Sequence, residues 1–429
     1  MENPPRVTAL PIGEFDSKSV KSEFEAIIQV FKALEVDLFT APPVSSEEEA
    51  RRSIKRLSKR NPDFFLLVPL RGLSAQMIET TVLSSSILCL IWPVQGRFAL
   101  PSSTLAVGAL DESEVPVELF YAPPDNITTP PRIQSITRAA KVYSRLSHSR
   151  IGIIGNLFPN LVSCRYDPGI IESRLGTKFL SISFEELRDV MKSLSHHPHD
   201  LEQFRQNITI KHTLSAPDIN LIDESVKLHL ALKQLASEYK IDGFATDCWI
   251  GFPREIGINP CFGFIEDVYM LACEGDVMVC LSQLIVKYII GANPFVGDLF
   301  DLDIDGILTL AHCGAPASLA LKSEDALLKN SQRAIQKGFA TLTCRPQLSP
   351  GPVTILRFYG KSCDKMHVAM GELIKSEDSL DLIVTIKLFG DRWDFLNQCF
   401  GNHYIVVPGD IRNELKFLCK WLRISFCET

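Results

Sequence analysis

The run from Phe64 to Val68, five apolar residues in succession, constrains the fold more than any other segment. A strand with one solvated face alternates apolar and polar residues, whereas a strand buried on both faces of a parallel sheet does not. Other strand-like segments lie at 7–11, 36–39 and 87–92, and apolar residues at helical spacing lie between them, at 17–34, 45–59 and 74–80. This alternation predicts βαβ units and a parallel sheet covered by helices.

Two changes of pattern divide the rest of the chain. A Pro- and Thr-rich stretch at 122–132 precedes a second region of alternating strands and helices, which starts near Arg150. After residue 293, short turns separate strand-like runs, as is typical of an antiparallel barrel or sandwich. These runs are 307–311, 340–345, 352–358, 366–370 and 380–388. We therefore predict an α/β fold of two doubly wound Rossmann-like domains and a mostly antiparallel β C-terminal domain, with boundaries at 1–148, 149–292 and 293–429.

Charge and cysteine content exclude several functional classes. The chain has 44 Lys and Arg against 51 Asp and Glu, a net charge of −7, and no dense basic run, so nucleic acid is not an expected partner. Its 12 cysteines include no CxxC pair, which indicates a reducing compartment. Apolar stretches fall short of the roughly 20 residues of a membrane span, and the first residues lack the pattern of a secretory signal. We expect a cytoplasmic protein without membrane contact.

Residues 247–316 carry most of the candidate site residues, because each expected strand end or turn there bears one acid or histidine. Ligands of α/β sheets gather outside the carboxyl ends of strands. Glu274 follows a short apolar run and precedes an apolar helical stretch at 277–290. It is either a site residue or an acid favoured by the dipole of a helix start, and the pattern alone favours the second. Asp276 fits the helix start better and is the expected N-cap.

Asp298, His312 and His403 are the other candidates. Asp298 follows the apolar residues 295–297 and is predicted to stand at the end of a strand. His312 ends one expected strand and His403 starts another. A single histidine in such a place is more often a hydrogen-bonded core residue than a ligand, since imidazole suits both roles.

Two other metal chemistries fit the sequence less well. Asp301, Asp303 and Asp305 match the first half of a calcium-binding loop, but the acid required at its last position is missing. Cys273 and Cys313 flank the candidate residues and would favour zinc. Because neither has a CxxC companion, we interpret both as small buried residues.

The candidate segments resemble the L-fucose isomerase / L-arabinose isomerase superfamily. The resemblance is good over about 150–429, most specific at 272–276 and 312–315, and limited to general layout over 1–148. The matching pieces are Cys248-Trp249, Asn259 to Cys261, Ala272 to Asp276, Phe295 to Asp298, His312 to Ala315 and Gly401 to Tyr404.

This resemblance implies a metal-dependent aldose–ketose isomerase that acts on a sugar or sugar derivative through an enediolate intermediate. It implies that Glu274 and Asp298 are catalytic and also hold a divalent metal, Mn²⁺ or else Mg²⁺, together with His312 and His403. In known members, a neighbour's N-terminal domain caps each active site. The resemblance therefore also implies a homo-oligomer.

Two alternatives remain at this point. A non-catalytic sugar-binding or regulatory protein could use the same scaffold, and it would not need two acids and two histidines at one metal. A dinucleotide oxidoreductase would use the glycines of residues 152–155, but this run lacks the GxGxxG spacing.

Overall fold

The computed structural model describes residues 4–111, 113–124, 131–194, 202–204, 206, 213–214, 219–266, 268–320 and 326–429. The chain forms two compact units, residues 1–145 with 413–421 and residues 146–412 with 422–429. Among the described residues, no helix combines the length and the apolar character that crossing a membrane would require. Most of the stretch expected as a linker, 125–130, lies outside the described residues.

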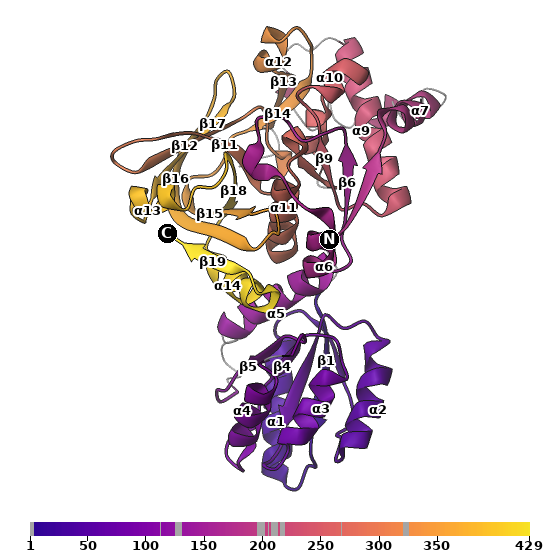
Figure 1. Cartoon of the computed structure of the whole chain (residues 1–429), viewed down its shortest axis with the longest axis vertical. Helices are drawn as coiled ribbons and strands as arrows, with labels where there is room; N and C mark the ends of the chain where they lie inside the picture. Colours follow the sequence, from indigo (N-terminus) through magenta and orange to yellow (C-terminus); the bar gives the residue numbers. More distant parts are fainter. Residues whose placement is uncertain are drawn as a thin grey trace. The chain divides into compact units, whose positions relative to one another are not determined.

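The first unit is built on a parallel five-stranded sheet in the order β2-β1-β3-β4-β5 (Figure 1). Its strands are β1 (Arg6–Ile12), β2 (Asp37–Thr40), β3 (Phe64–Pro69), β4 (Cys89–Ile91) and β5 (Val117–Leu119). Its helices are α1 (Lys18–Lys32), α2 (Glu47–Ser58), α3 (Ala75–Leu83), α4 (Ala99–Ala109), α5 (Pro131–Leu146) and α14 (Arg412–Leu422).

Strand β3 shows why its sequence is apolar throughout. Phe64 and Leu66 belong to a core cluster with α1, α5 and α14, whereas Phe65 and Leu67 belong to a second cluster with α2, α3 and α4. Because successive residues of a strand point to opposite faces, helices cover both faces of this sheet. The prediction of a parallel sheet with a strand buried on both sides is confirmed.

The second unit begins with a parallel sheet in the order β10-β9-β6-β7. Its strands are β6 (Arg150–Ile154), β7 (Lys178–Ile182), β9 (Gly243–Thr246) and β10 (Met270–Ala272). The accompanying helices are α6 (Pro168–Leu175), α7 (Phe184–Leu194), α9 (Ile219–Tyr239) and α10 (Gly251–Glu255), with the 3₁₀ helices η1 (Val162–Cys164), η2 (Pro260–Ile265) and η3 (Cys273–Gly275). Apolar side chains of α9 and η2 pack with this sheet in one core.

A mostly antiparallel barrel follows, in the order β15-β18-β11-β12-β17-β16-β19, and a further pairing of β15 with β16 closes it. Its strands are β11 (Phe295–Leu302), β12 (Ile307–His312), β15 (Gly351–Tyr359), β16 (Lys365–Asp378), β17 (Leu382–Leu388), β18 (His403–Pro408) and β19 (Ser425–Glu428). Helix α13 (Arg392–Asn397) connects β17 to β18. The barrel confirms the antiparallel character predicted for this region.

One predicted strand lies elsewhere. The run 340–345 forms β14 (Leu342–Pro346), which pairs with β13 (Ala326–Asn330) in a small sheet that also contains β8 (Thr213–Leu214). Leu342 and Cys344 pack into the core of the middle sheet, and this burial separates β14 from the barrel. The 3₁₀ helix η4 (Ala317–Leu319) and helix α12 (Gln332–Gln336) flank β13.

Helix α11 (Val277–Ile290) joins the middle sheet to the barrel. It packs on β9 and β10 and also on β15 and β18, and nearly all of its residues are buried. A helix that is apolar all round needs such a position between two layers. The N-terminus of α11 therefore lies between the two sheets, and η3, which contains Glu274, precedes it.

Candidate active site

Asp276 links the start of α11 to the barrel. Its Oδ1 accepts hydrogen bonds from the backbone N–H groups of Met278 (3.0 Å) and Val279 (3.2 Å), which confirms the predicted N-cap. Its Oδ2 accepts from Arg357 Nη2 at 3.2 Å and lies 3.0 Å from His403 Nδ1. Burial raises the pKa of Asp276, but the Arg357 charge and the His403 hydrogen bond outweigh it and hold the pKa well below its usual value.

His403 is oriented by this carboxylate. With Nδ1 directed at Asp276, its Nε2 lies 3.2 Å from Asp298 Oδ1 and 3.9 Å from Glu274 Oε2. Burial lowers the pKa of a histidine, but the hydrogen bonds to Asp276 and Asp298 raise the pKa of His403 to about 10. A carboxylate behind one ring nitrogen, with the other nitrogen facing further acids, is the arrangement that orients metal-ligating histidines in proteins.

Glu274 adopts an unusual backbone conformation, with φ 60° and ψ 18°. A non-glycine residue in this left-handed region costs roughly 1–2 kcal/mol. Its N–H donates to Cys248 Sγ (3.3 Å) and its carbonyl accepts from the Phe158 N–H (2.8 Å). Gly275 is also left-handed, and a Cβ there would lie 2.6 Å from the Asn156 carbonyl oxygen. Strain of this kind, held by neighbours, is typical of functional positions.

The two carboxylates differ in acidity. Burial is the main cause that raises the pKa of Glu274 above its ordinary value. Burial acts in the same direction on Asp298, but the hydrogen bond and charge of His403 outweigh it and lower the pKa of Asp298. Environments that make the pKa values of two neighbouring carboxyl groups differ are typical of acid–base pairs in active sites.

The prediction that Asp298 ends a strand is wrong. Strand β11 continues to Leu302, and Asp298 lies within it, paired with His403 of β18 on one side and Ala311 of β12 on the other. This pairing explains how a mid-strand residue reaches the site, because it sets Asp298 opposite the first residue of β18. Asn402 Nδ2 also donates to Asp298 Oδ1, at 2.8 Å.

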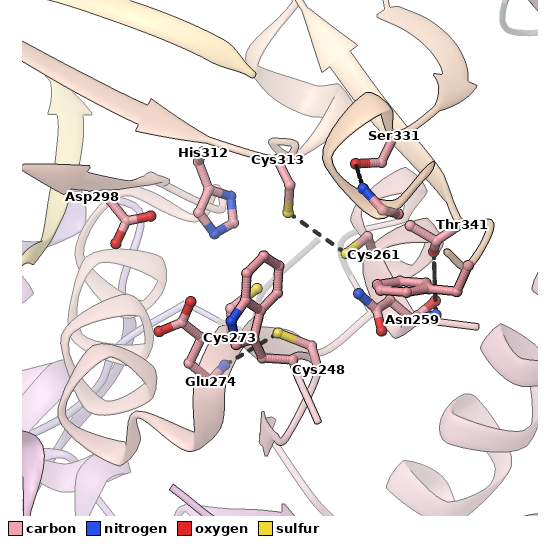
Figure 2. Close-up of a pocket in the computed structure, with 13 residues that line it drawn as sticks. Cys248, Asn259, Cys261, Cys273, Glu274, Asp298, His312, Cys313, Ser331 and Thr341 are labelled. Carbon is pink, nitrogen blue, oxygen red and sulfur yellow. Dashed lines mark hydrogen bonds between the residues drawn. The ribbon is translucent and has the colours of Figure 1, made fainter. Parts of the chain in front are cut away.

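His312 ends β12, as predicted, and lies on another side of the same space. Figure 2 shows its ring near the carboxylates of Glu274 and Asp298. Its Nδ1 lies 2.7 Å from the Gly314 carbonyl oxygen and donates to it, which leaves Nε2 as the acceptor.

Glu274 and Asp298 line two pockets. The first is a small cavity of ≈ 30 Å³, which is also lined by His312, Trp249 and several cysteines. The second, of ≈ 550 Å³, is lined on its other sides by residues that include Phe300 and Asn402. The acids therefore face, in the second pocket, space that a small molecule could occupy.

Sequence reasoning missed Arg357, whose guanidinium is buried and donates both to Asp276 and to the His403 carbonyl oxygen (2.6 Å). A signal was present, because Arg357 interrupts the apolar run of β15, and a buried charge requires a partner. That the partner is Asp276, far away in sequence, does not follow from the pattern.

No protein-family model matches the chain. Curated relatives do match it, at low identity, and all four bear the name sulfoquinovose isomerase. The protein from Alkalicoccus urumqiensis is 21% identical over 390 residues, which is 86% of each chain. The protein from Priestia aryabhattai is 24% identical over 366 residues, 78% of each chain, and the one from Clostridium sp. (strain MSTE9) is 23% identical over 311 residues, 68% of each chain.

Among solved structures, a periplasmic solute-binding protein of an ABC transporter from Actinobacillus succinogenes, with bound D-allose, matches with 11% identity. The match covers 67% of this chain and 93% of that one, with a TM-score of 0.18, which is too low to indicate a common fold.

Proposed function

We propose that this chain is a metal-dependent aldose–ketose isomerase of the L-fucose/L-arabinose isomerase type, acting on a sugar or sugar derivative through an enediolate. Four relatives that bear the name of a sugar isomerase, three of them matching over 78% or more of the chain, support the isomerase assignment. The observation that carries the proposal is the convergence of Glu274 and Asp298 on Nε2 of His403, with Asp276 behind the ring.

The donor set fits a hard divalent cation. The same carboxylates that stabilise a proton on His403 would stabilise a cation there, and His312 Nε2 is available as a further ligand. Oxygen donors mixed with imidazole suit Mn²⁺ or Mg²⁺. When bound, such a cation would polarise the carbonyl and adjacent hydroxyl of the sugar and stabilise developing negative charge.

The chain's own residues divide the proton transfers. Glu274, whose pKa is raised, takes the proton from the carbon next to the carbonyl and returns it to the neighbouring carbon. Asp298, whose pKa is lowered, stays ionised and assists proton movement between the two substrate oxygens. Asp276 and Arg357 keep His403 in place while this occurs.

The relatives' name points to a substrate with an anionic group, since sulfoquinovose is a glucose derivative that carries a sulfonate. Trp249 lines the first pocket, and Lys337 Nζ lies 3.3 Å from the centre of its ring. Lys337 thus supplies positive charge beside Trp249 at the first pocket, where it could pair with the sulfonate of a substrate.

A panel of sugars tests the proposal. The purified protein, analysed for metal and supplied with Mn²⁺, is incubated with sulfoquinovose, glucose, L-fucose and L-arabinose, and the products are identified by NMR. Conversion of at least one aldose to its ketose supports the isomerase. Binding of a sugar without any conversion would favour the alternative, a non-catalytic sugar-binding protein.

We further propose a homo-oligomer in the cytoplasm and a doubly wound arrangement of both parallel domains. The oligomer follows from the resemblance, and closed symmetric assemblies are common among enzymes. The cytoplasmic location rests on the sequence, whose 12 cysteines include no CxxC pair. A monomer measured by light scattering under conditions in which the protein is fully active would contradict the proposed oligomer.

A further inference from the structure

A group of thiols shares the first pocket with the carboxylates. Cys248, Cys261, Cys273 and Cys313 all line it, although they come from four separate segments of the chain (Figure 2). The sulfur atoms of Cys261 and Cys313 lie 3.7 Å apart. The proposed isomerase chemistry uses none of these thiols.

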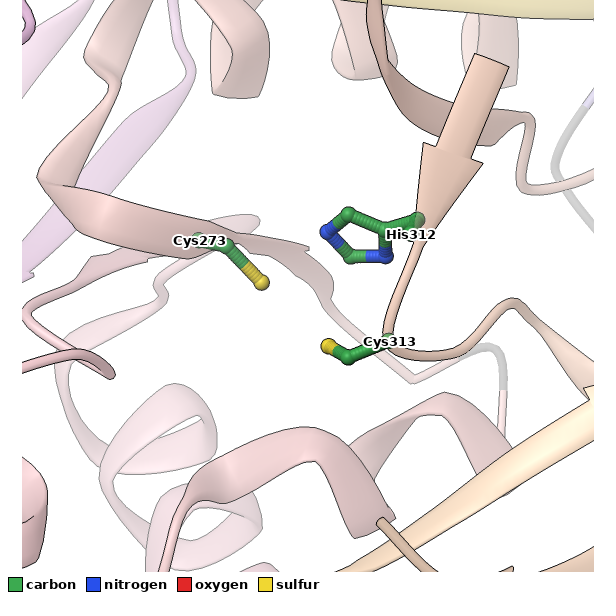
Figure 3. Close-up of side chains that lie close together, drawn as sticks. All are labelled: Cys273, His312 and Cys313. Atoms are coloured by element: carbon green, nitrogen blue, oxygen red, sulfur yellow. The ribbon is translucent and has the colours of Figure 1, made fainter. Parts of the chain in front are cut away.

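Three potential metal ligands converge within this group. One ligand atom each from Cys273, His312 and Cys313 lies within 4.8 Å of the other two (Figure 3). Cys273 and His312 are buried, and Cys313 is partly so. Cys261 lies beside this three-residue group and not within it. Its thiol contacts that of Cys313 and interacts with that of Cys273.

The spacing of one sulfur pair is close to that of a tetrahedral thiolate site. A Zn–S bond of about 2.3 Å places two sulfur ligands of one tetrahedral ion roughly 3.8 Å apart. The 3.7 Å between Cys261 and Cys313 is close to this value. A disulfide would require the same sulfurs to approach to about 2.05 Å.

The backbone turn after β12 holds two of the ligands in place. His312 donates from Nδ1 to the Gly314 carbonyl, so Nε2 is the nitrogen left to bind a metal. Thr343 Oγ1 donates to the Cys313 carbonyl (3.0 Å), and a Cβ at Gly314 would collide with that same hydroxyl. The turn is thereby fixed against β14 before any ion binds.

We propose that Cys273, Cys313 and His312 Nε2, with Cys261 as the fourth ligand, form a site for a soft divalent cation, Zn²⁺ being the expected ion. Thiolate and imidazole donors select zinc over the hard cations that carboxylates prefer. Each cysteine that binds gives up its thiol proton to solvent, so binding releases protons.

This site and the carboxylate site compete for one ligand, His312. If the proposed function is correct, zinc at the thiols removes His312 from the cation beside Glu274 and lowers isomerase turnover. That consequence rests on the proposed function, whereas zinc binding itself does not.

Cobalt spectroscopy tests the site. The full-length chain is reduced, stripped of metal with a chelator and titrated with Co²⁺, which reports thiolate ligands by an intense charge-transfer band in the near ultraviolet. We expect this band to saturate at one ion per chain and to disappear when Zn²⁺ is added. Cys273→Ala and Cys313→Ala should each weaken zinc binding by at least roughly tenfold.

Cys344→Ala is the matched control, because Cys344 is buried in the same unit, as Cys273 is, but lies outside the group. Glu274→Gln should keep the cobalt band while losing isomerase activity. An unchanged band in both Cys273→Ala and Cys313→Ala, or no charge-transfer band in the wild type, would overturn the zinc site. If the wild type shows the band but converts no sugar, the zinc site stands and the proposed isomerase function fails.

Discussion

His403 and His367 are both buried in the same barrel, yet their surroundings are opposite. His403 lies between the carboxylates of Asp276 and Asp298, and its pKa is raised to about 10. His367 lies between the hydroxyls of Tyr404 and Thr429, each 2.9 Å from a ring nitrogen, and burial lowers its pKa to about 4. Burial alone therefore produces a neutral histidine, whereas buried acids produce one that holds a positive charge.

This difference separates a core histidine from a candidate ligand. The hydroxyl partners satisfy both nitrogens of His367 and leave no position for a substrate or an ion. At His403 one nitrogen is fixed by Asp276, and the other faces two acids at a pocket. Each of the following experiments changes one side of this comparison.

Replacing Glu274 by Gln should have the largest effect. The change is nearly isosteric but removes the base and one negative charge next to His403, and loss of a general base typically slows turnover ~10²–10⁴-fold. The measurement is the rate of aldose-to-ketose conversion, with circular dichroism to check the fold. His367→Gln is the control and should keep the rate within about threefold of wild type, as expected for a residue remote from the chemistry. Equal rates for the wild type and Glu274→Gln would show that Glu274 has no catalytic role and is only an acid favoured at a helix start.

Asp276→Asn should have the next largest effect, because it alters the group that orients His403 and leaves the Arg357 charge without its partner. Loss of such a supporting carboxylate typically lowers metal affinity ~10–100-fold. Titration of Mn²⁺ followed by electron paramagnetic resonance measures this affinity, and urea unfolding measures stability separately. A less stable variant with wild-type Mn²⁺ affinity would show that Asp276 serves only as a helix cap.

His367 and His403 should contribute to the pH dependence of the free energy of unfolding with opposite signs. The folded chain holds His367 neutral down to about pH 4, while the unfolded chain protonates it near 6.5. The contribution of neutral His367 to the free energy of unfolding, about 3 kcal/mol, is therefore complete above pH 6.5. It is lost as the pH falls through 4. The stabilisation from charged His403 is complete below pH 6.5 and is lost as the pH rises through 10.

Urea unfolding of metal-free protein across this range checks both signs. His367→Gln should flatten the acidic side of the profile and His403→Gln the alkaline side. Profiles that keep both slopes in both variants would mean that other groups control the pH dependence.

Local patterns predicted much of the fold and part of the site. Unbroken apolar strands predicted the parallel sheet, and the acid before an apolar helix predicted the Asp276 cap. Asp298 was misplaced because strand ends are hard to locate when a charged residue lies within the strand. The Asp276–Arg357 pair and the thiol group join residues from distant segments, and no local spacing encodes such contacts.

Interconversion of sulfoquinovose in D₂O, followed by NMR on metal-stripped and on Mn²⁺-reconstituted protein, tests the central claim most directly. Our account predicts no conversion by stripped protein and restored aldose–ketose conversion with Mn²⁺. It also predicts that conversion either introduces solvent deuterium at C1 or C2 or, if the site shields the transfer, retains the substrate proton. Two results would contradict the claim that a metal at Glu274, Asp298 and His403 isomerises a sugar. One is conversion that survives exhaustive chelation, and the other is sugar binding without conversion when Mn²⁺ is present.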